Sequence, residues 1–162
     1  MNEQNNRNHV SVSFAEKLNA WMTNDNFVIV MTSNIVSINN NTDQLNQTCG
    51  YSLGLNLQGI HDFVIFAEPA IAAKAISNVV DWIRKGNEIK LDTVCTDLIP
   101  EFPVVFKEVN NEKINKDFKP INLYKTQPRH KTIQIVTPDS DQIFPWEEGY
   151  NPEHDEKQTL LF

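Results

Sequence analysis

His61, followed by Asp62, is the residue pair in this 162-residue sequence whose side chains best suit catalysis. A histidine beside a carboxylate can act as a general base or as a metal ligand. Adjacent residues of a strand point to opposite faces, so the two side chains could cooperate only within a loop. Asp139 is the alternative carboxylate partner for His61. The competing interpretation, a structural histidine held by hydrogen bonds, is favoured.

A second group of candidates lies near the C-terminal end, where carboxylates surround aromatic rings. Two carboxylates can divide acid and base roles if burial separates their pKa values. However, Asp139 follows Pro138 as in a turn, and we expect the glutamates to be solvated. Rings with polar tips are common in binding hot spots. The candidate binding residues are Trp146, Glu147, Glu148 and Tyr150. The structural alternative, in which the Trp146 ring is buried in the core, is favoured for that residue.

The cysteines and histidines do not have the spacing of a metal site. Cys49 and Cys95 are far apart, and the four histidines are scattered along the chain. A metal site needs three or four convergent ligands, so we expect no metal and no other cofactor. A free cysteine is most often a small buried apolar residue. The sequence also lacks a nucleophile elbow, a Walker loop and a dinucleotide-binding fingerprint, which favours a protein that is not an enzyme.

Composition excludes some classes of partner. Hydrophobic residues make up 40% and charged residues 22% of the chain, as in soluble globular proteins. The formal net charge of −7 argues against nucleic-acid binding, which needs clustered basic residues. No apolar run approaches the roughly twenty residues of a membrane span. We expect a cytoplasmic monomer or homodimer that binds a protein partner. The acidic charge permits a basic partner, although simple solubility is the favoured explanation of the charge.

The residue pattern predicts an α+β fold. We expect a frayed tail over residues 1–10 and a single domain over residues 11–162 with a mainly antiparallel sheet of five or more strands and two principal helices. Helices are predicted at 11–22 and 69–85, with a short one at 116–124. Strands are predicted at 27–31, 35–38, 51–55, 63–66, 90–96, 103–109 and 132–136, with a turn at 39–43.

Residues 69–85 give the clearest helix signal. Pro69 suits the first turn and Gly86 suits the left-handed stop. An apolar stripe is formed by Ile71, Ala72, Ala75, Ile76, Val79 and Ile83. We expect the face that carries Ile76, Val79 and Ile83 to be buried.

Two further segments are marked by their glycine and proline residues. Gly54 interrupts a strand pattern, which predicts a bulge or a close approach of the backbone. Residues 137–150 are too rich in rings for a solvated tail and too rich in proline for a helix or strand. We predict an ordered loop with Phe144, Pro145 and Gly149 as its structural motif.

The order of these motifs resembles the bacterial domain-of-unknown-function family 4262. The resemblance rests on the Tyr51-Ser52-Leu53-Gly54-Leu55 segment, His61, Gln134, Pro138-Asp139, the Phe144-Pro145-Trp146-x-x-Gly149-Tyr150 segment and Gln158-x-Leu160-Leu161. It covers about residues 48–162. The family usually has Trp where this chain has Thr137, and Pro-Glu where it has Asp62-Phe63. The family has no settled activity, so the resemblance implies a fold and little chemistry.

The order of elements is also similar to that of the suppressor-of-fused domain. Bacterial relatives of that domain include immunity proteins that bind and neutralise toxins. This likeness implies a small inhibitor of immunity or anti-defence type that acts by protein contact. The alternative function is a small hydrolase that uses His61 with Asp62 or Asp139.

Overall fold

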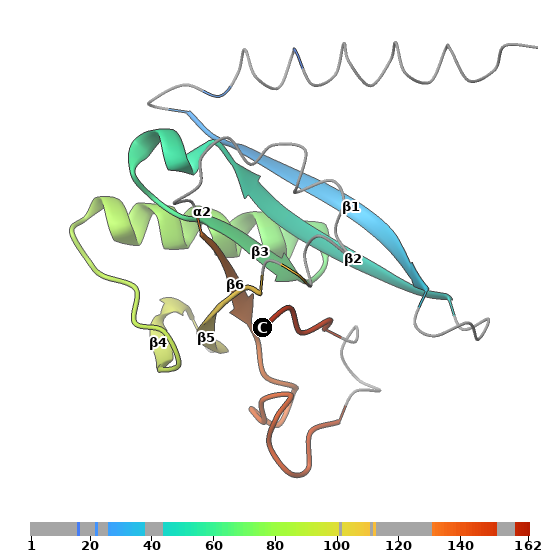
Figure 1. Ribbon diagram of the computed structural model, residues 1–162. Helices are drawn as coiled ribbons and strands as arrows, with labels where there is room; N and C mark the ends of the chain where they lie inside the picture. The colour runs from blue at the N-terminus through green and yellow to red at the C-terminus, as the bar shows by residue number, and fades with distance from the viewer. Residues whose placement is uncertain are drawn as a thin grey trace, which may run out of the picture.

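The computed structural model shows one mixed six-stranded sheet with one main helix (Figure 1). It describes residues 16, 22, 26–37, 44–100, 102–110, 112, 131–151 and 158–162, with the backbone alone at 32–37 and 44–47. The elements are β1 (Val28–Ser37), β2 (Gln44–Leu53), η1 (Leu55–Gln58), β3 (Asp62–Phe66), α2 (Pro69–Arg84), β4 (Val94–Ile99), β5 (Phe102–Glu108) and β6 (Thr132–Val136). The α+β fold class agrees with the sequence analysis.

The strands follow the order β1-β2-β3-β6-β5-β4 across the sheet. β3 and β6 run parallel, while β1–β2, β2–β3, β5–β6 and β4–β5 are antiparallel. All five residues of β3 and all five of β6 are buried. The two strands lie at the centre of the sheet, where layers on both faces exclude water. This placement confirms the prediction of a buried central strand at 63–66.

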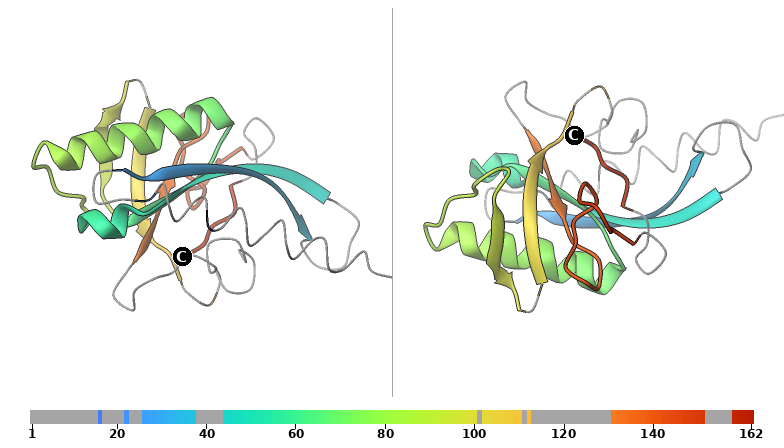
Figure 2. Two further views of the ribbon diagram at one scale, coloured as in Figure 1. Left: turned by 90° about the horizontal axis from the view of Figure 1, so that it is seen from above. Right: turned by 90° about the horizontal axis from the view of Figure 1, so that it is seen from below.

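Helix α2 lies along one face of the sheet (Figure 2). Pro69 begins it, and Gly86 follows it with a φ of 90°, as the sequence predicts. The buried residues of its apolar stripe are Ala72, Ala75, Ile76, Val79 and Val80. Ile71 was expected in this stripe, but it is 49% exposed because it lies at the edge of the buried face. Gly50 of β2 lets the helix approach closely, since a Cβ there would lie 2.7 Å from the Ala72 Cβ.

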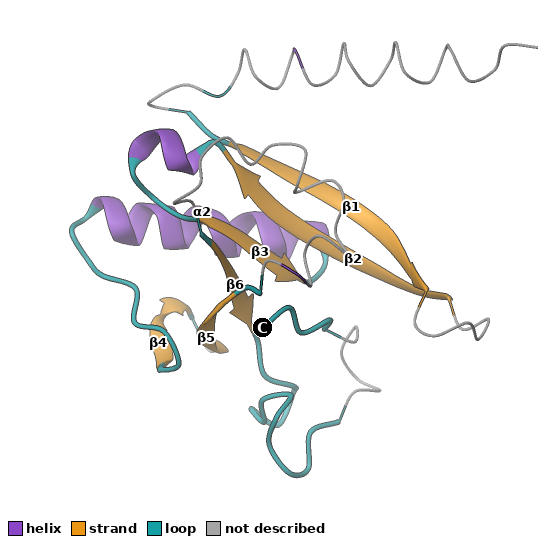
Figure 3. Cartoon of the chain, viewed as in Figure 1, coloured by secondary structure: helices purple, strands orange, loops and turns teal. Residues whose placement is uncertain are grey.

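The opposite face of the sheet is covered by chain from the C-terminal end (Figures 1 and 2). Leu161 packs with Val64 and Phe66 of β3, and Phe144 packs with Val105 and Val136. Phe144 belongs to a loop, residues 137–151, that contains no helix or strand (Figure 3). The sequence predicted this ordered loop. Phe144 helps to cover the face opposite α2, which further helices cover in sheets that have helices on both faces.

Several predicted boundaries are wrong. Residues 35–37 continue β1 and do not form a second strand. The strand expected at 51–55 ends at Leu53, because Gly54 adopts a φ of 95° and Leu55 begins η1. The strand expected at 90–96 begins only at Val94.

Other predictions lie outside the described residues. The helix expected at 11–22 is described only at Glu16, which is helical, and at Met22. The tail at 1–10, the turn at 39–43 and the short helix at 116–124 are not described. None of the helices among the described residues has the length and apolar character to cross a membrane.

Candidate binding surface

Two glutamines fasten the end of the chain to the sheet. Gln134 of β6 is fully buried, its Nε2 donates to the Thr159 carbonyl at 2.8 Å, and its Oε1 accepts from the Leu161 N–H at 2.9 Å. Gln158 repeats this arrangement with the Thr137 backbone, donating to its carbonyl at 2.7 Å and accepting from its N–H at 3.1 Å. We call residues 158–162 the C-terminal strap. The sequence analysis quoted both glutamines in the motif but did not recognise their pairing role.

Asp139 organises the loop that follows β6. It is 1% exposed. Its Oδ1 accepts from the N–H groups of Asp141 at 3.0 Å and Ile143 at 2.9 Å, and its Oδ2 accepts from that of Asn151 at 2.9 Å. The carboxylate therefore ties the start of the loop to its end. This geometry supports a structural role for Asp139 and the buried Pro138 before it, and it offers no support for acid–base catalysis.

Trp146 belongs to an aromatic cluster that also contains Phe144 and Phe162. The Trp146 ring stacks on Phe144 with centroids 5.1 Å apart and an interplanar angle of 5°. It meets Phe162 edge to face at 6.0 Å. The Lys107 Nζ lies 4.9 Å from the Trp146 centroid and 5.1 Å from that of Phe162. It also forms an ion pair with Asp92 at 2.6 Å. The cluster thus joins the loop, the C-terminal strap and β5.

The expectation that the Trp146 ring is buried is wrong. Trp146 is 45% exposed, whereas Phe144 beneath it is 5% exposed. The Phe ring fills the core position, so the indole packs on top of it. The ring is therefore held in one orientation and still faces solvent.

The remaining loop candidates have different surroundings. Glu147 is exposed, as expected, and its Oε2 also accepts from the Phe144 N–H at 2.7 Å. Glu148 is exposed and Tyr150 is half-buried. Pro145, which lies between Phe144 and Trp146 in the sequence, is half-buried. Gly149 has a φ of 92°, which fits its place in a turn.

The three residues of the predicted hydrolase site have different surroundings. Asp62 is buried and accepts from the Ser52 hydroxyl at 2.8 Å and the Leu55 N–H at 3.3 Å, while His61 is exposed. Asp62 lies beside Thr132 at the start of the parallel β3–β6 pair, and Asp139 follows the end of β6. A five-residue strand spans roughly 13 Å, so His61 and Asp139 belong to opposite ends of the central strands. His61 ends the connection between β2 and β3, in which Gly54 turns the chain, and Tyr51 is buried within β2.

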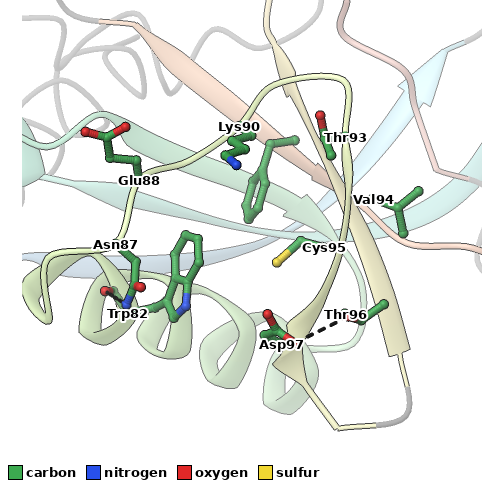
Figure 4. A pocket seen from close by; sticks show the side chains of 10 residues that line it. Trp82, Asn87, Glu88, Lys90, Thr93, Val94, Cys95, Thr96 and Asp97 are labelled. Atoms are coloured by element: carbon green, nitrogen blue, oxygen red, sulfur yellow. Dashed lines mark hydrogen bonds between the residues drawn. The ribbon is translucent and has the colours of Figure 1, made fainter.

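Two hollows flank β4, one on each face of the sheet. The outer hollow has a volume of about 530 Å³ and faces the loop. It is lined by Val94, Thr96, Phe102, Pro103, Gln142, Phe144 and Glu147. The inner hollow has a volume of about 360 Å³ and lies between β4 and the end of α2 (Figure 4). It is lined by Trp82, Asn87, Glu88, Lys90, Thr93, Val94, Cys95, Thr96, Asp97 and Phe106. Neither hollow is lined by His61, Asp62 or Asp139.

Three large apolar side chains at or beside the outer hollow are exposed. Val94 is 53% and Phe102 is 50% exposed, and both line the outer hollow. Trp146, 45% exposed, stacks on Phe144, which lines the same hollow. We call β4 with these three side chains the β4 rim. The sequence analysis found Trp146 but missed Val94 and Phe102, because their spacing is that of an ordinary hairpin.

The comparison with protein families gives one match. A family described as Domain of unknown function (DUF4262) matches residues 31–151, which is more than half of the chain. The chain belongs to the DUF4262 family. No curated protein and no solved structure matches it. In this DUF4262 domain, Gln134, Asp139 and Gln158 have structural roles. The matched residues include the whole β4 rim, whereas Gln158 and Phe162 of the C-terminal strap lie beyond them.

The described part of this DUF4262 domain contains no group of three or more His, Cys, Asp or Glu side chains placed to hold a metal ion. His130 and His154 lie outside the described residues. Cys49 is buried, and Cys95 is half-buried at the inner hollow.

Proposed function

We propose that this protein is a small binding protein that inhibits or neutralises another protein by contact, as an immunity or anti-defence protein does. The observation that carries the proposal is the β4 rim. Its three large apolar side chains are each about half exposed. Val94 and Phe102 line the outer hollow, and Trp146 stacks on Phe144, which lines it too. Exposed apolar side chains that gather at one place, with a polar border, are typical of protein interaction sites.

The rigidity of Trp146 supports the proposal further. Its ring is held by Phe144, Phe162 and Lys107. A side chain that is already ordered loses little conformational entropy on binding, which raises the affinity that its contact area gives. Tryptophan is also among the residues most enriched in binding hot spots.

The charges near the β4 rim favour a basic partner. Asp141, Glu147 and Glu148 are exposed in the loop beside the outer hollow. The nearby Lys107 is paired with Asp92 and packed against two rings, so it offsets little of this negative charge. Opposite charge on a partner would speed association and make it sensitive to salt. A cytoplasmic location is part of the proposal, since it would keep Cys49 and Cys95 reduced.

A hydrolase remains the second candidate from the sequence, but the geometry favours it less. Catalysis needs a base within hydrogen-bond reach of a bound substrate. Of the three residues proposed for it, Asp62 and Asp139 already hold backbone N–H groups, and none lines either hollow.

Photo-crosslinking in cells tests the proposal. A photoreactive phenylalanine analogue is placed at Phe102, and in a control protein at Ile71, which is equally exposed at 49% but lies on α2. We expect a discrete crosslinked protein from position 102 that position 71 does not give. The same products from both positions, or none from position 102, would contradict a binding role for the β4 rim.

A further inference from the structure

We propose that β4 receives an extended, basic segment of the partner as a seventh strand, with alternate side chains of that segment entering the two hollows. This inference rests on the proposed protein-binding function of the β4 rim, and it specifies the partner's conformation and charge. Pairing of an extended peptide with the open edge of a sheet is a recurring mode of recognition.

The first argument is that β4 is an open edge. Among the strands that the structure describes, it is the last on its side of the sheet. The Phe106 carbonyl accepts from the Asp92 N–H at 3.0 Å, so the Phe106 backbone faces the β4 side of β5. Backbone direction alternates along a strand, so Val104 faces that side too, toward its register partner Cys95. The backbone N–H and C=O groups of Val94 and Thr96 therefore point away from β5, toward solvent.

The first half of the edge lacks the usual protection against a new strand. Sheet edges are commonly blocked by lysine or proline residues. β4 has the sequence Val-Cys-Thr-Asp-Leu-Ile, in which Asp97 is the single charged residue. A register shift lies between Cys95, which pairs with Val104, and Ile99, which pairs with Phe102. This irregularity limits the regular edge to its first half, so we place the partner's pairing at Val94 and Thr96.

The two hollows have the positions that a seventh strand requires. Figure 4 shows Cys95 and Asp97 directed toward α2, and Val94 and Thr96 directed the other way. Successive side chains of an added strand point alternately to the same two faces. One set would enter the inner hollow beside Trp82, and the other would enter the outer hollow beside Phe102.

The lining of the hollows selects for long basic side chains. The outer hollow combines the apolar walls of Phe102 and Phe144 with the carboxylate of Glu147. The inner hollow combines the walls of Trp82 and Phe106 with Glu88 and Asp97, against one lysine, Lys90. Arginine and lysine can lay an aliphatic stem on an apolar wall and keep the charged head at a carboxylate. Each hollow therefore accepts such a side chain, whereas an acidic one would be repelled.

Labelled peptides test the proposal by fluorescence anisotropy. The probe is a capped six-residue peptide that alternates arginine and valine. The controls are the same peptide with glutamate in place of arginine and two N-methylated forms, one methylated on the arginine nitrogens and one on the valine nitrogens. In a strand pairing, one set of N–H groups faces β4 and the other faces solvent. We expect one methylated form to bind at least about tenfold more weakly and the other to bind within about threefold of the probe.

Protein variants locate the binding. Thr96→Pro removes an outward N–H from the edge, where proline is compatible with the fold, and Thr96→Ala keeps that N–H. We expect Thr96→Pro to lose binding and Thr96→Ala to keep it. Glu147→Gln retains an acceptor for the Phe144 N–H while removing the charge, so it should weaken binding several-fold at low salt. Glu68→Gln, at the exposed start of α2, is the control.

The outcomes distinguish this inference from the proposed function. Equal binding of both methylated peptides, or equal binding of the acidic and basic peptides, would overturn strand pairing or the basic segment while leaving the crosslink from Phe102 unaffected. Absence of any binding by the probe would also overturn the inference. If Thr96→Pro fails to fold, the methylated peptides still decide the question on the unaltered protein.

Discussion

Replacement of Gln134 by leucine should destabilise the protein by detaching the C-terminal strap. The Gln134 amide is fully buried and binds the Thr159 carbonyl and the Leu161 N–H. Leucine fills much of the same volume but satisfies neither group. Each buried group left without a partner costs about 1–3 kcal/mol, so the variant should lose roughly 2–6 kcal/mol of unfolding free energy.

The loss has an upper limit, because the strap can detach and leave its polar groups in water. Detachment would expose Leu161, which is 1% exposed in the native protein. Burial of a leucine side chain contributes about 1.5–3 kcal/mol, and the strap's other contacts would add to this. The cost of Gln134→Leu should therefore not exceed the cost of deleting residues 158–162.

Urea unfolding of four proteins checks this reasoning. They are the unaltered chain, Gln134→Leu, a chain that ends at residue 157, and the combination of the two changes. We expect Gln134→Leu to cost several-fold less in the shortened chain, because its partners are already absent. An equal cost in both backgrounds would refute the idea that Gln134 acts through the strap.

The other predictions concern the core, the aromatic cluster and one turn. Trp146→Ala should lower the free energy of unfolding by about 1–2 kcal/mol, less than the 3–5 kcal/mol lost with a core ring, because 45% of the residue is exposed. Thermal unfolding measures this loss, and a loss of about 3–5 kcal/mol would contradict the surface placement of the ring. Ile76→Asp places a charge at a fully buried position of α2 and should cost several kcal/mol, comparable with the stability of a whole domain; a soluble variant with an unchanged melting temperature would contradict it. Gly54→Val should destabilise by at least about 1 kcal/mol because its φ is 95° and an added Cβ would lie 2.9 Å from the Met22 Cγ. Alanine at both Gly54 and Gly59 isolates the steric part, because Gly59 has a similar φ of 73° but open space around it. Equal losses of stability for the two alanine variants would exclude a steric contribution at Gly54.

Local sequence patterns predicted the elements that depend on local chemistry. The helix from Pro69 was predicted because apolar spacing, a first-turn proline and a terminal glycine agree there. The strands at 63–66 and 132–136 were predicted from their short apolar or alternating runs. The ordered loop was found because its rings and prolines suit no regular element. These signals lie within a few residues of one another, so they can be read without knowledge of the tertiary structure.

Features that depend on distant parts of the chain were missed. The parallel pairing of β3 with β6 joins residues about seventy positions apart, and no local pattern specifies it. Gln134 seemed to be a polar position of an alternating strand, but its partners lie in the strap. Trp146 was expected inside because of its size, whereas Phe144 takes the buried position. The edge position of β4 likewise follows from the sheet order.

The central claim, that the β4 rim is the surface that binds a partner, can be tested by hydrogen exchange. The partner recovered by crosslinking from position 102 is purified, and exchange of the backbone amides is measured with and without it. We expect slower exchange at Val94, Thr96 and residues 142–147, and unchanged exchange at residues 69–73 of α2. Protection confined to α2 or to the β1–β2 hairpin, with Val94 and Thr96 unaffected, would contradict the claim.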